Sequence, residues 1–230
     1  MRTCRATSVT HPNRTSAGRY PNVNTPLPCD LTIRPVRADE ADQHIELTQL
    51  VDLHLSAEDL PDLITAIRAS LRHEGGPLSH GLHHYLFAES PDGTPVASIH
   101  CGPPLWVLRN PAIFPHMQRK LVKRVSCIDT LAVHPDYRGR GIATTLLRRV
   151  EADFRNAGFV ALTLRHEHAK RHFFTRRGYT SVASLAMILP PVGLVTQTNP
   201  GWRHAVKPLT DDVSFTTVQG LPAATGFLPA

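Results

Sequence analysis

The chain has 230 residues, of which 41% are hydrophobic and 19% are charged, and this balance fits one globular domain with tails. Lysine and arginine outnumber aspartate and glutamate by 25 to 19, so the net charge is +6 and a phosphate-bearing partner is expected. The apolar runs are too short for a membrane span, and four cysteines without C-x-x-C spacing indicate reduced thiols in a cytoplasmic protein.

The distribution of proline predicts how the chain is organised. All 20 prolines lie outside residues 136–189, where long regular elements are expected. Residues 1–29 are rich in arginine and serine and have no apolar segment after Met1, which predicts a disordered arm without a secretory signal; the composition also fits an organelle transit segment. Residues 190–230 hold six prolines and are predicted to be an irregular C-terminal extension with one alternating run, 213–218.

Hydrophobic periodicity in residues 30–189 predicts the element order βααβββαβαβ, an α/β or α+β domain. The expected strands are 31–36, 85–89, 96–101, 125–133, 160–164 and 180–189. Four helices are expected, beginning at Asp39, at Ser56 or Asp59, at Ile142 and at His168. The first has Leu47, Leu50, Val51 and His54 on one face. Residues 102–125 form a proline-broken insertion, which is interpreted as an acceptor lid, a second phosphate contact or a surface elaboration.

A glycine-rich loop, residues 133–143, joins the strand at 125–133 to the helix at Ile142. Its glycines let the backbone approach a ligand, and the free amides and dipole of the helix N-terminus favour an anion. Arg138 and Arg140 add positive charge. The loop is neither a nucleoside-triphosphate P-loop nor a dinucleotide-binding motif. By itself it predicts either a pyrophosphate site or an ordinary turn with solvated arginines.

The pattern Arg-x-x-Gly-x-Ala, Arg138 to Ala143, follows a strand that ends in Leu131-Ala132-Val133 and precedes an amphipathic helix. It resembles the acetyl-coenzyme A signature of the GNAT superfamily of N-acetyltransferases, with matching motifs over 126–180 and matching element order over 31–189. The resemblance implies an α/β (α+β) fold with a GNAT-like mixed central sheet flanked by helices. It also implies acetyl-CoA as cosubstrate and no metal.

In this family the strand backbone pairs with the pantetheine arm, and the loop amides hold the pyrophosphate. The resemblance therefore assigns coenzyme binding to Leu131, Ala132, Val133, Arg138, Gly139, Arg140, Gly141, Ile142, Ala143 and Thr144. A splay between two strands would leave an amide near Val133 free to bond the acetyl carbonyl, which makes Val133 a catalytic candidate as oxyanion donor. The amine attacks directly in a ternary complex.

A general base is needed because an alkyl ammonium with a pKa of ~10 must lose a proton before attack. We select Asp129, which strand alternation places on the same face as Cys127 and Leu131. His100 and Glu89 are the alternatives. Cys127 is interpreted as a buried thiol in preference to a nucleophile.

The general acid is not identified by the resemblance. The family's usual tyrosine corresponds to Phe174 here and its usual asparagine to Glu167, while Tyr179 is interpreted as a core aromatic. The remaining candidates are histidines. His166, His168 and His172 are candidate phosphate contacts, His134 is interpreted as structural, and the cluster His80, His83, His84 lacks the second cluster that a metal site needs.

Residues 38–67 hold eight acidic residues and no lysine or arginine, which indicates either an acidic acceptor wall or a solvated helix face. The predicted function is acetyl-CoA-dependent acetylation of a primary amine on a small cationic molecule, an antibiotic or a metabolite. The alternatives are a protein lysine or N-terminal acetyltransferase, and a non-catalytic acyl-CoA-sensing domain. Neither nucleic acid nor membrane is an expected partner, and a homodimer is left open.

Overall fold

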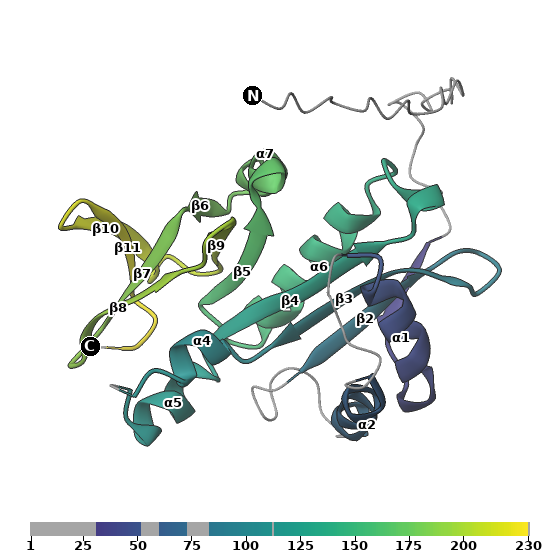
Figure 1. Cartoon of the computed structure of the whole chain (residues 1–230), viewed down its shortest axis with the longest axis horizontal. Helices are drawn as coiled ribbons and strands as arrows, with labels where there is room; N and C mark the ends of the chain where they lie inside the picture. Colours follow the sequence, from purple (N-terminus) through teal and green to yellow (C-terminus); the bar gives the residue numbers. More distant parts are fainter. Residues whose placement is uncertain (1–30, 52–59, 73–82, 112, 230) are drawn as a thin grey trace, which may run out of the picture.

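The computed structural model describes residues 31–51, 60–72, 83–111 and 113–229, which form two sheets flanked by helices (Figure 1). The predicted N-terminal arm, His54, His80 and the predicted helix starts at Ser56 and Asp59 lie outside the described residues. None of the described helices is long and apolar enough to cross a membrane.

A seven-stranded sheet has the order β1-β2-β3-β4-β5-β9-β6, and a four-stranded sheet has the order β10-β11-β7-β8. The large sheet consists of β1 (Thr32–Pro35), β2 (His84–Glu89), β3 (Pro95–Gly102), β4 (Val125–Val133), β5 (Ala161–Glu167), β6 (Thr180–Val182) and β9 (Trp202–Pro208). The small sheet consists of β7 (Ser184–Leu189), β8 (Gly193–Thr198), β10 (Ser214–Val218) and β11 (Leu221–Thr225). The helices are α1 (Ala41–Thr48), α2 (Leu60–Leu71), α4 (Leu105–Leu108), α5 (Pro115–Leu121), α6 (Ile142–Asn156) and α7 (Arg171–Thr175).

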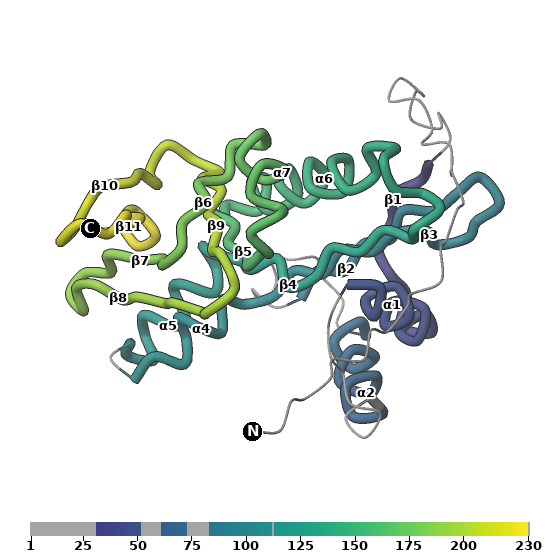
Figure 2. Tube along the Cα trace, turned by 45° about the horizontal axis from the view of Figure 1, so that its top comes forward, coloured from purple at the N-terminus to yellow at the C-terminus, as the bar shows by residue number. Residues whose placement is uncertain are grey.

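Helices cover both faces of the large sheet: α6 and α7 lie on one face, and α1, α2, α4 and α5 lie on the other (Figure 2). The predicted apolar stripe of α6 is confirmed, since five of its side chains are buried. They are Ile142, Leu146, Leu147, Val150 and Phe154. On the opposite face, α1 and α2 pack on Tyr85 and Phe87, whereas α4 and α5 pack beside Val125, Ala161 and Val206.

The strands β4 and β5 part halfway along their length. They pair in parallel from Val125–Ala161 to Ile128–Leu164 only, although β4 stays paired with β3 as far as Val133. The β3–β4 register shifts at the same level, where Thr130 pairs with His100 and Ile128 with Cys101, so Asp129 is the extra residue of a β-bulge. The second half of β4 therefore has a strand on one side only.

Two predicted elements differ from the structure. The first helix ends at Thr48, so Leu50 and Val51, which were predicted on its apolar face, lie in the turn that follows. The predicted last strand, 180–189, is two strands, because β6 belongs to the large sheet and β7 to the small one. Periodicity does not reveal that change of sheet, since both strands alternate alike.

The prediction that residues 190–230 are irregular is wrong. The segment forms β8 to β11, and β9 lies inside the large sheet between β5 and β6. Pro190, Pro191 and Pro200 lie in turns, and Pro208 is the last residue of β9. Pro222 lies within β11, just before the residues that pair with β7. A high proline content here marks the frequency of turns, not the absence of strands.

The insertion 102–125 contains α4 and α5, whose apolar side chains share one core with the small sheet. Val107, Met117 and Leu121 are buried together with Met187 and Phe227. The Arg124 Nε also donates to the Phe227 carbonyl oxygen at 2.7 Å. The insertion and the C-terminal strands therefore support each other beside the large sheet.

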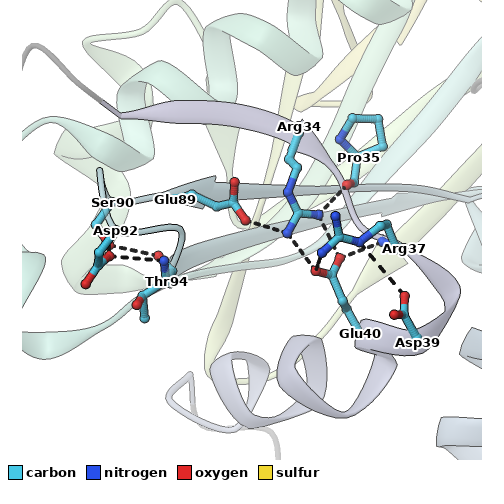
Figure 3. A network of polar contacts seen from close by, with 9 residues as sticks. All are labelled: Arg34, Pro35, Arg37, Asp39, Glu40, Glu89, Ser90, Asp92 and Thr94. Atoms are coloured by element: carbon cyan, nitrogen blue, oxygen red, sulfur yellow. Dashed lines mark hydrogen bonds and ion pairs between the residues drawn. The ribbon is translucent and has the colours of Figure 1, made fainter.

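A charge network secures the other edge of the large sheet (Figure 3). Glu40, with its side chain only 8% exposed, pairs with Arg34 and Arg37, both at 2.6 Å. Arg34 also pairs with Glu89. The network joins β1, the turn before α1 and the end of β2.

Candidate active site

The glycine-rich loop ends in an uncapped helix N-terminus. Gly139 and Gly141 have φ of 76° and 80°, in the left-handed region that glycine adopts without strain. Gly141 is the N-cap of α6, and no side chain caps this end. The amides of the first helical turn have no partner within the helix, so they are available to an anion beside Arg138 and Arg140.

The backbone of Leu131 and Val133 faces the gap between β4 and β5. The His134 amide donates to the Val96 carbonyl at 2.9 Å, and alternate residues of an antiparallel strand bond to the same neighbour. The carbonyl and amide groups of Leu131 and Val133 therefore point away from β3. Arg138 agrees with this, because its Nε donates to the Val133 carbonyl at 3.0 Å from the open side.

The C-terminal end of α7 contacts the first turn of α6. The Arg177 Nε donates to Thr144 Oγ1 at 3.1 Å, and its guanidinium lies 3.6 Å from the centre of the Phe173 ring. Gly178 has the φ of 79° expected of a helix cap, as predicted. Sequence reasoning missed Arg177, because no local pattern links residues 33 positions apart.

The side chains of α7 supply no hydroxyl at position 174, where the family usually has its tyrosine general acid. Phe174 is buried and lies 5.0 Å, ring centre to ring centre, from His166. Tyr179 is 2% exposed, which confirms it as a core aromatic. The prediction that His166 contacts phosphate is not supported, because its nitrogens bond to the Glu167 carbonyl and to Ser181. His168 and His172 are exposed and stay predictions.

Asp129 lies on the face of the large sheet opposite α6. Its side chain is 41% exposed, and one oxygen lies 3.7 Å from His100 Nδ1. The protein atoms packed around the carboxylate raise the pKa of Asp129 to about 6, against the opposing effects of Cys127 and Arg165. This carboxyl group therefore changes charge near neutral pH.

A cluster of aromatic and histidine rings packs beside Asp129. His100 stacks on Tyr85 with ring centres 4.2 Å apart, and its Nε2 lies 2.8 Å from His83 Nδ1. His44 on α1 bonds to Ser98 at 2.6 Å. Burial lowers the pKa of His83 and His100 and brings the pKa of His44 to about 4, so these rings are neutral at pH 7.

Gly102 makes the close approach of these groups possible. A Cβ at this position would lie 2.8 Å from Asp129 Oδ2 and 2.9 Å from His83 Nδ1. The absence of a side chain at the end of β3 thus leaves the space that the carboxylate and the imidazole share.

Other predicted residues lie elsewhere or in another role. Glu89 is held by Arg34 at the opposite end of β2 from His84, roughly 17 Å away at ~3.3 Å per residue. The Cys127 thiol is buried beside Asp129, and burial raises its pKa far above its usual range, so it is no thiolate nucleophile. His134 Nδ1 accepts from the Asp136 amide, which is the structural role expected.

The histidine cluster of the sequence separates in the structure. His83 bonds to His100, whereas His84, its neighbour, bonds to Asp153 on α6 at 3.1 Å. Within the described ranges, no group of histidine, cysteine and acidic side chains is placed to hold a metal ion.

Two of the eight acids on which the predicted acceptor wall rests are neutralised by arginines, and Asp52, Glu58 and Asp59 lie outside the described residues, so the wall stays a prediction. Glu40 is paired with Arg34 and Arg37, and Asp42 is paired with Arg68 at 2.6 Å. The balancing arginines stand just outside the 38–67 window, so the window alone overstated the free negative charge.

The comparisons with known proteins agree with this geometry. The profile described as the acetyltransferase (GNAT) family matches residues 49–179, more than half of the chain. The chain belongs to the GNAT acetyltransferase family. This acetyltransferase is accordingly an acyltransferase that uses acetyl-CoA, and its mixed sheets are of the GNAT kind.

Solved structures support the same fold. A GNAT-family acetyltransferase from Staphylococcus aureus superposes on the acetyltransferase with a TM-score of 0.52 at 15% identity, over 78% of this chain and 99% of that one. A protein assigned to the GNAT family from Desulfovibrio desulfuricans gives 0.53 at 17% identity, over 78% and 99%. Ard1 from Thermoplasma volcanium gives 0.51 at 11% identity, over 79% and 99%. No curated protein matches the sequence.

Proposed function

We propose that this acetyltransferase moves an acetyl group from acetyl-CoA to a primary amine of a small molecule, with Asp129 as general base. The observation that carries the proposal is a solvent-reaching carboxylate, with a pKa of about 6, at the bulge where β4 parts from β5. An ammonium group that reaches this point loses its proton to Asp129, and the free amine then attacks the acetyl carbonyl.

The coenzyme side of the proposal comprises the gap-facing backbone of β4 and the α6 N-terminus. Leu131, Ala132 and Val133 would hold the pantetheine arm by added-strand pairing. The pyrophosphate would lie on the loop of Arg138, Gly139, Arg140, Gly141, Ile142, Ala143 and Thr144. The uncapped amides, the left-handed glycines and the two arginines support this assignment.

Asp129 is preferred to its neighbour His100 as the base. His100 is buried against Tyr85, and its pKa lies well below its usual value, which makes it a weak base. Asp129 combines exposure with a pKa close to working pH, the combination that general-base catalysis favours. We assign His100 and His83 the role of positioning the Asp129 carboxylate.

The Leu131 amide is a better oxyanion donor for this base than the Val133 amide. Val133 is four residues from Asp129, roughly 13 Å along an extended strand, which is too far for one reacting centre. Leu131 is two residues away, about 7 Å, and faces the same gap. We therefore assign the Leu131 amide to the acetyl carbonyl oxygen and the Val133 amide to the pantetheine.

Departure of the thiolate proceeds without a donor from α7 in this proposal. The position of the family's tyrosine is Phe174, which is buried and has no hydroxyl. A free thiol has a pKa of ~8.5, so the thiolate is an acceptable leaving group near neutral pH and takes its proton from solvent.

Two variants test the two halves of the site. Asp129→Asn should lower the acetyl-transfer rate by ~10²–10⁴ and leave acetyl-CoA affinity unchanged, because only basicity is removed. Gly141→Asp should weaken acetyl-CoA binding in calorimetry more than Gly141→Asn, its neutral counterpart of equal shape. Full turnover by Asp129→Asn at pH 7, or equal affinity for acetyl-CoA in the two Gly141 variants, contradicts the corresponding half.

A further inference from the structure

We propose that the acceptor of this acetyltransferase is an amino acid, whose carboxylate is bound by Arg165 while its amine lies at Asp129. The inference rests on the proposed function and names the chemical class of its acceptor. It depends on the placement of Arg165, a residue that no motif of the sequence singles out.

Arg165 lies directly across the strand gap from Asp129. Ile128 and Leu164 are the last paired residues of β4 and β5, so Asp129 and Arg165 are the next residues on each strand. Leu164 packs in the core under α6, and alternation places Arg165 on the opposite face. The two charged side chains therefore share one face at the mouth of the splay.

Arg165 is exposed although its strand is in the interior of the seven-stranded sheet. Such a position is normally covered by a helix or an apolar layer. On this face α1 and α2 pack on Tyr85 and Phe87 of β2, and α4 and α5 pack beside Val125 and Ala161 at the starts of β4 and β5. Among the described residues, Asp129 and Arg165 are exposed between these two groups of helices.

The two charges influence each other but do not pair. The positive Arg165 lowers the pKa of Asp129, yet the described residues contain no ion pair or side-chain hydrogen bond that involves Arg165. The other arginines of the acceptor half, Arg34, Arg37 and Arg68, are paired with carboxylates. A ligand with an ammonium and a carboxylate satisfies both separated charges at once.

His204 provides a second polar group for the carboxylate. It pairs with Arg165 in the β5–β9 register and therefore lies on the same face. His204 is 1% exposed, and among the described residues its Nε2 has no hydrogen-bond partner, which is unfavourable for a buried polar atom unless a ligand satisfies it. Burial, with a smaller effect of Arg165, brings the pKa of His204 to about 4, so the ring is neutral at pH 7.

An aromatic ring lies next to this pair of groups. The Trp106 ring centre on α4 is 6.4 Å from that of His204. The insertion 102–125 thereby contributes an apolar contact at the carboxylate end of the site. This arrangement favours an amino acid with an apolar or aromatic side chain over a bare polyamine.

Matched pairs of acceptors that differ only by a carboxylate test the inference: phenylalanine against phenethylamine, tyrosine against tyramine, and lysine against cadaverine. Affinity is measured by calorimetry on the full chain saturated with coenzyme A, and acetyl transfer is measured with acetyl-CoA. For the amino acids that bind, we expect both affinity and kcat/KM to be at least tenfold higher than for the matched amine without the carboxylate. In Arg165→Gln this ratio should fall toward one, mainly through KM, and Arg165→Lys should restore part of it.

Arg119→Gln is the control, because Arg119 is also exposed but lies on α5, which contributes no group to the proposed site. A wild-type ratio of one or less overturns the inference, as does a ratio that survives in Arg165→Gln. If the proposed function itself is wrong, no acceptor is acetylated. In that case the ratio of amino acid affinity to amine affinity, measured in the coenzyme A complex, still decides the inference.

Discussion

At the scale of single residues, the bulge at Asp129 lies where β4 is paired with β3 on one side but no longer with β5 on the other. On one side, Thr130 and Ile128 stay paired with β3, while on the other side the pairing with β5 has ended. The extra residue turns its side chain out of the regular alternation toward His83 and His100. A carboxylate in such a place is partly desolvated, and this is the cause of its raised pKa.

The pH dependence of the rate should report this carboxylate. Because the base acts when it is ionised, kcat/KM should fall as the pH drops below about 6, the folded pKa of Asp129. Asp129→Asn has no such ionisation, so the ratio of wild-type to variant rates should shrink toward low pH. The ratio cancels the titration of the amine itself. A ratio that is constant from pH 5 to pH 8 would place the base elsewhere.

Gly102→Ala should disturb the chemistry more than the fold. Its Cβ would meet the ends of the Asp129 and His83 side chains, which can rotate away, so the melting temperature should change little. The displaced carboxylate should cost up to ~10²-fold in kcat. The double variant Gly102→Ala/Asp129→Asn is the control. If Gly102 acts through the Asp129 carboxylate, adding Gly102→Ala to Asp129→Asn should not lower kcat further. A full additional loss in the double variant contradicts this role.

At the scale of elements, two additions enlarge the sheet region: the insertion with α4 and α5, and the small sheet. The chain leaves the large sheet after β6, forms the β7–β8 hairpin, returns as β9 and leaves again as β10 and β11. The buried side chains of α5 and of the small sheet form one core. Each addition therefore depends on the other for the burial of its apolar face.

Gly226, which follows β11, lies against the backbone just before β10. Its φ is 89°, and a Cβ would lie 1.9 Å from the Asp212 carbonyl oxygen, a backbone atom that cannot rotate away. Gly226→Ala should destabilise the protein by more than about 3 kcal/mol. Gly220→Ala is the matched control, because its φ is 80° but nothing lies within 4 Å, and it should cost about 1 kcal/mol. Urea unfolding compares the two, and equal losses would contradict the steric argument.

At the scale of the whole molecule, both ends of the large sheet are joined to distant parts of the chain. Toward one edge, β9 pairs with β5 along its whole length, from Ala161–Pro208 to Glu167–Trp202, and β6 is the edge strand beyond it. At the other edge, the network of Glu40, Arg34 and Glu89 joins β1 to β2 (Figure 3). The site, on β4 and β5, lies between these two edges.

The Glu40 network should make stability depend on acid. The arginine partners hold the pKa of Glu40 at about 2, below its ordinary 4.5, so its contribution is complete above pH 4.5 and is lost as the pH falls toward 2. The contribution at pH 7 is about 2–3 kcal/mol. Glu40→Gln should therefore lower the free energy of unfolding at pH 7 much more than at pH 2.5. Asp39→Asn, on an 83% exposed side chain, should have little effect at either pH; a Glu40 effect that is independent of pH would contradict the linkage.

Local pattern was enough for the elements and loops that carry the family's chemistry. The apolar stripe of α6, the β2–β3 hairpin, the left-handed glycines of the loop and the cap at Gly178 follow from side-chain spacing and from the φ that glycine permits. Strand alternation selected Asp129, with His100 on the hairpin as an alternative base, and the two side chains lie 3.7 Å apart. The prediction that Leu131 shares the face of Asp129 is wrong, because the bulge turns the Leu131 side chain toward the core under α6.

Only the tertiary structure decided what depends on pairing between distant segments. The place of β9 between β5 and β6, the arginine partners of Glu40 and Asp42, and the contact of Arg177 with Thr144 all join residues that no local window contains. The same holds for Arg165 and Asp129, which are neighbours because two strands pair and then part. Sequence by itself determined most strands and helices of residues 30–189 and the position of the glycine-rich loop, since these depend on spacing along the chain. It did not determine which strands are adjacent, because many pairings bury alternating side chains equally well and only the packing of the whole molecule selects one.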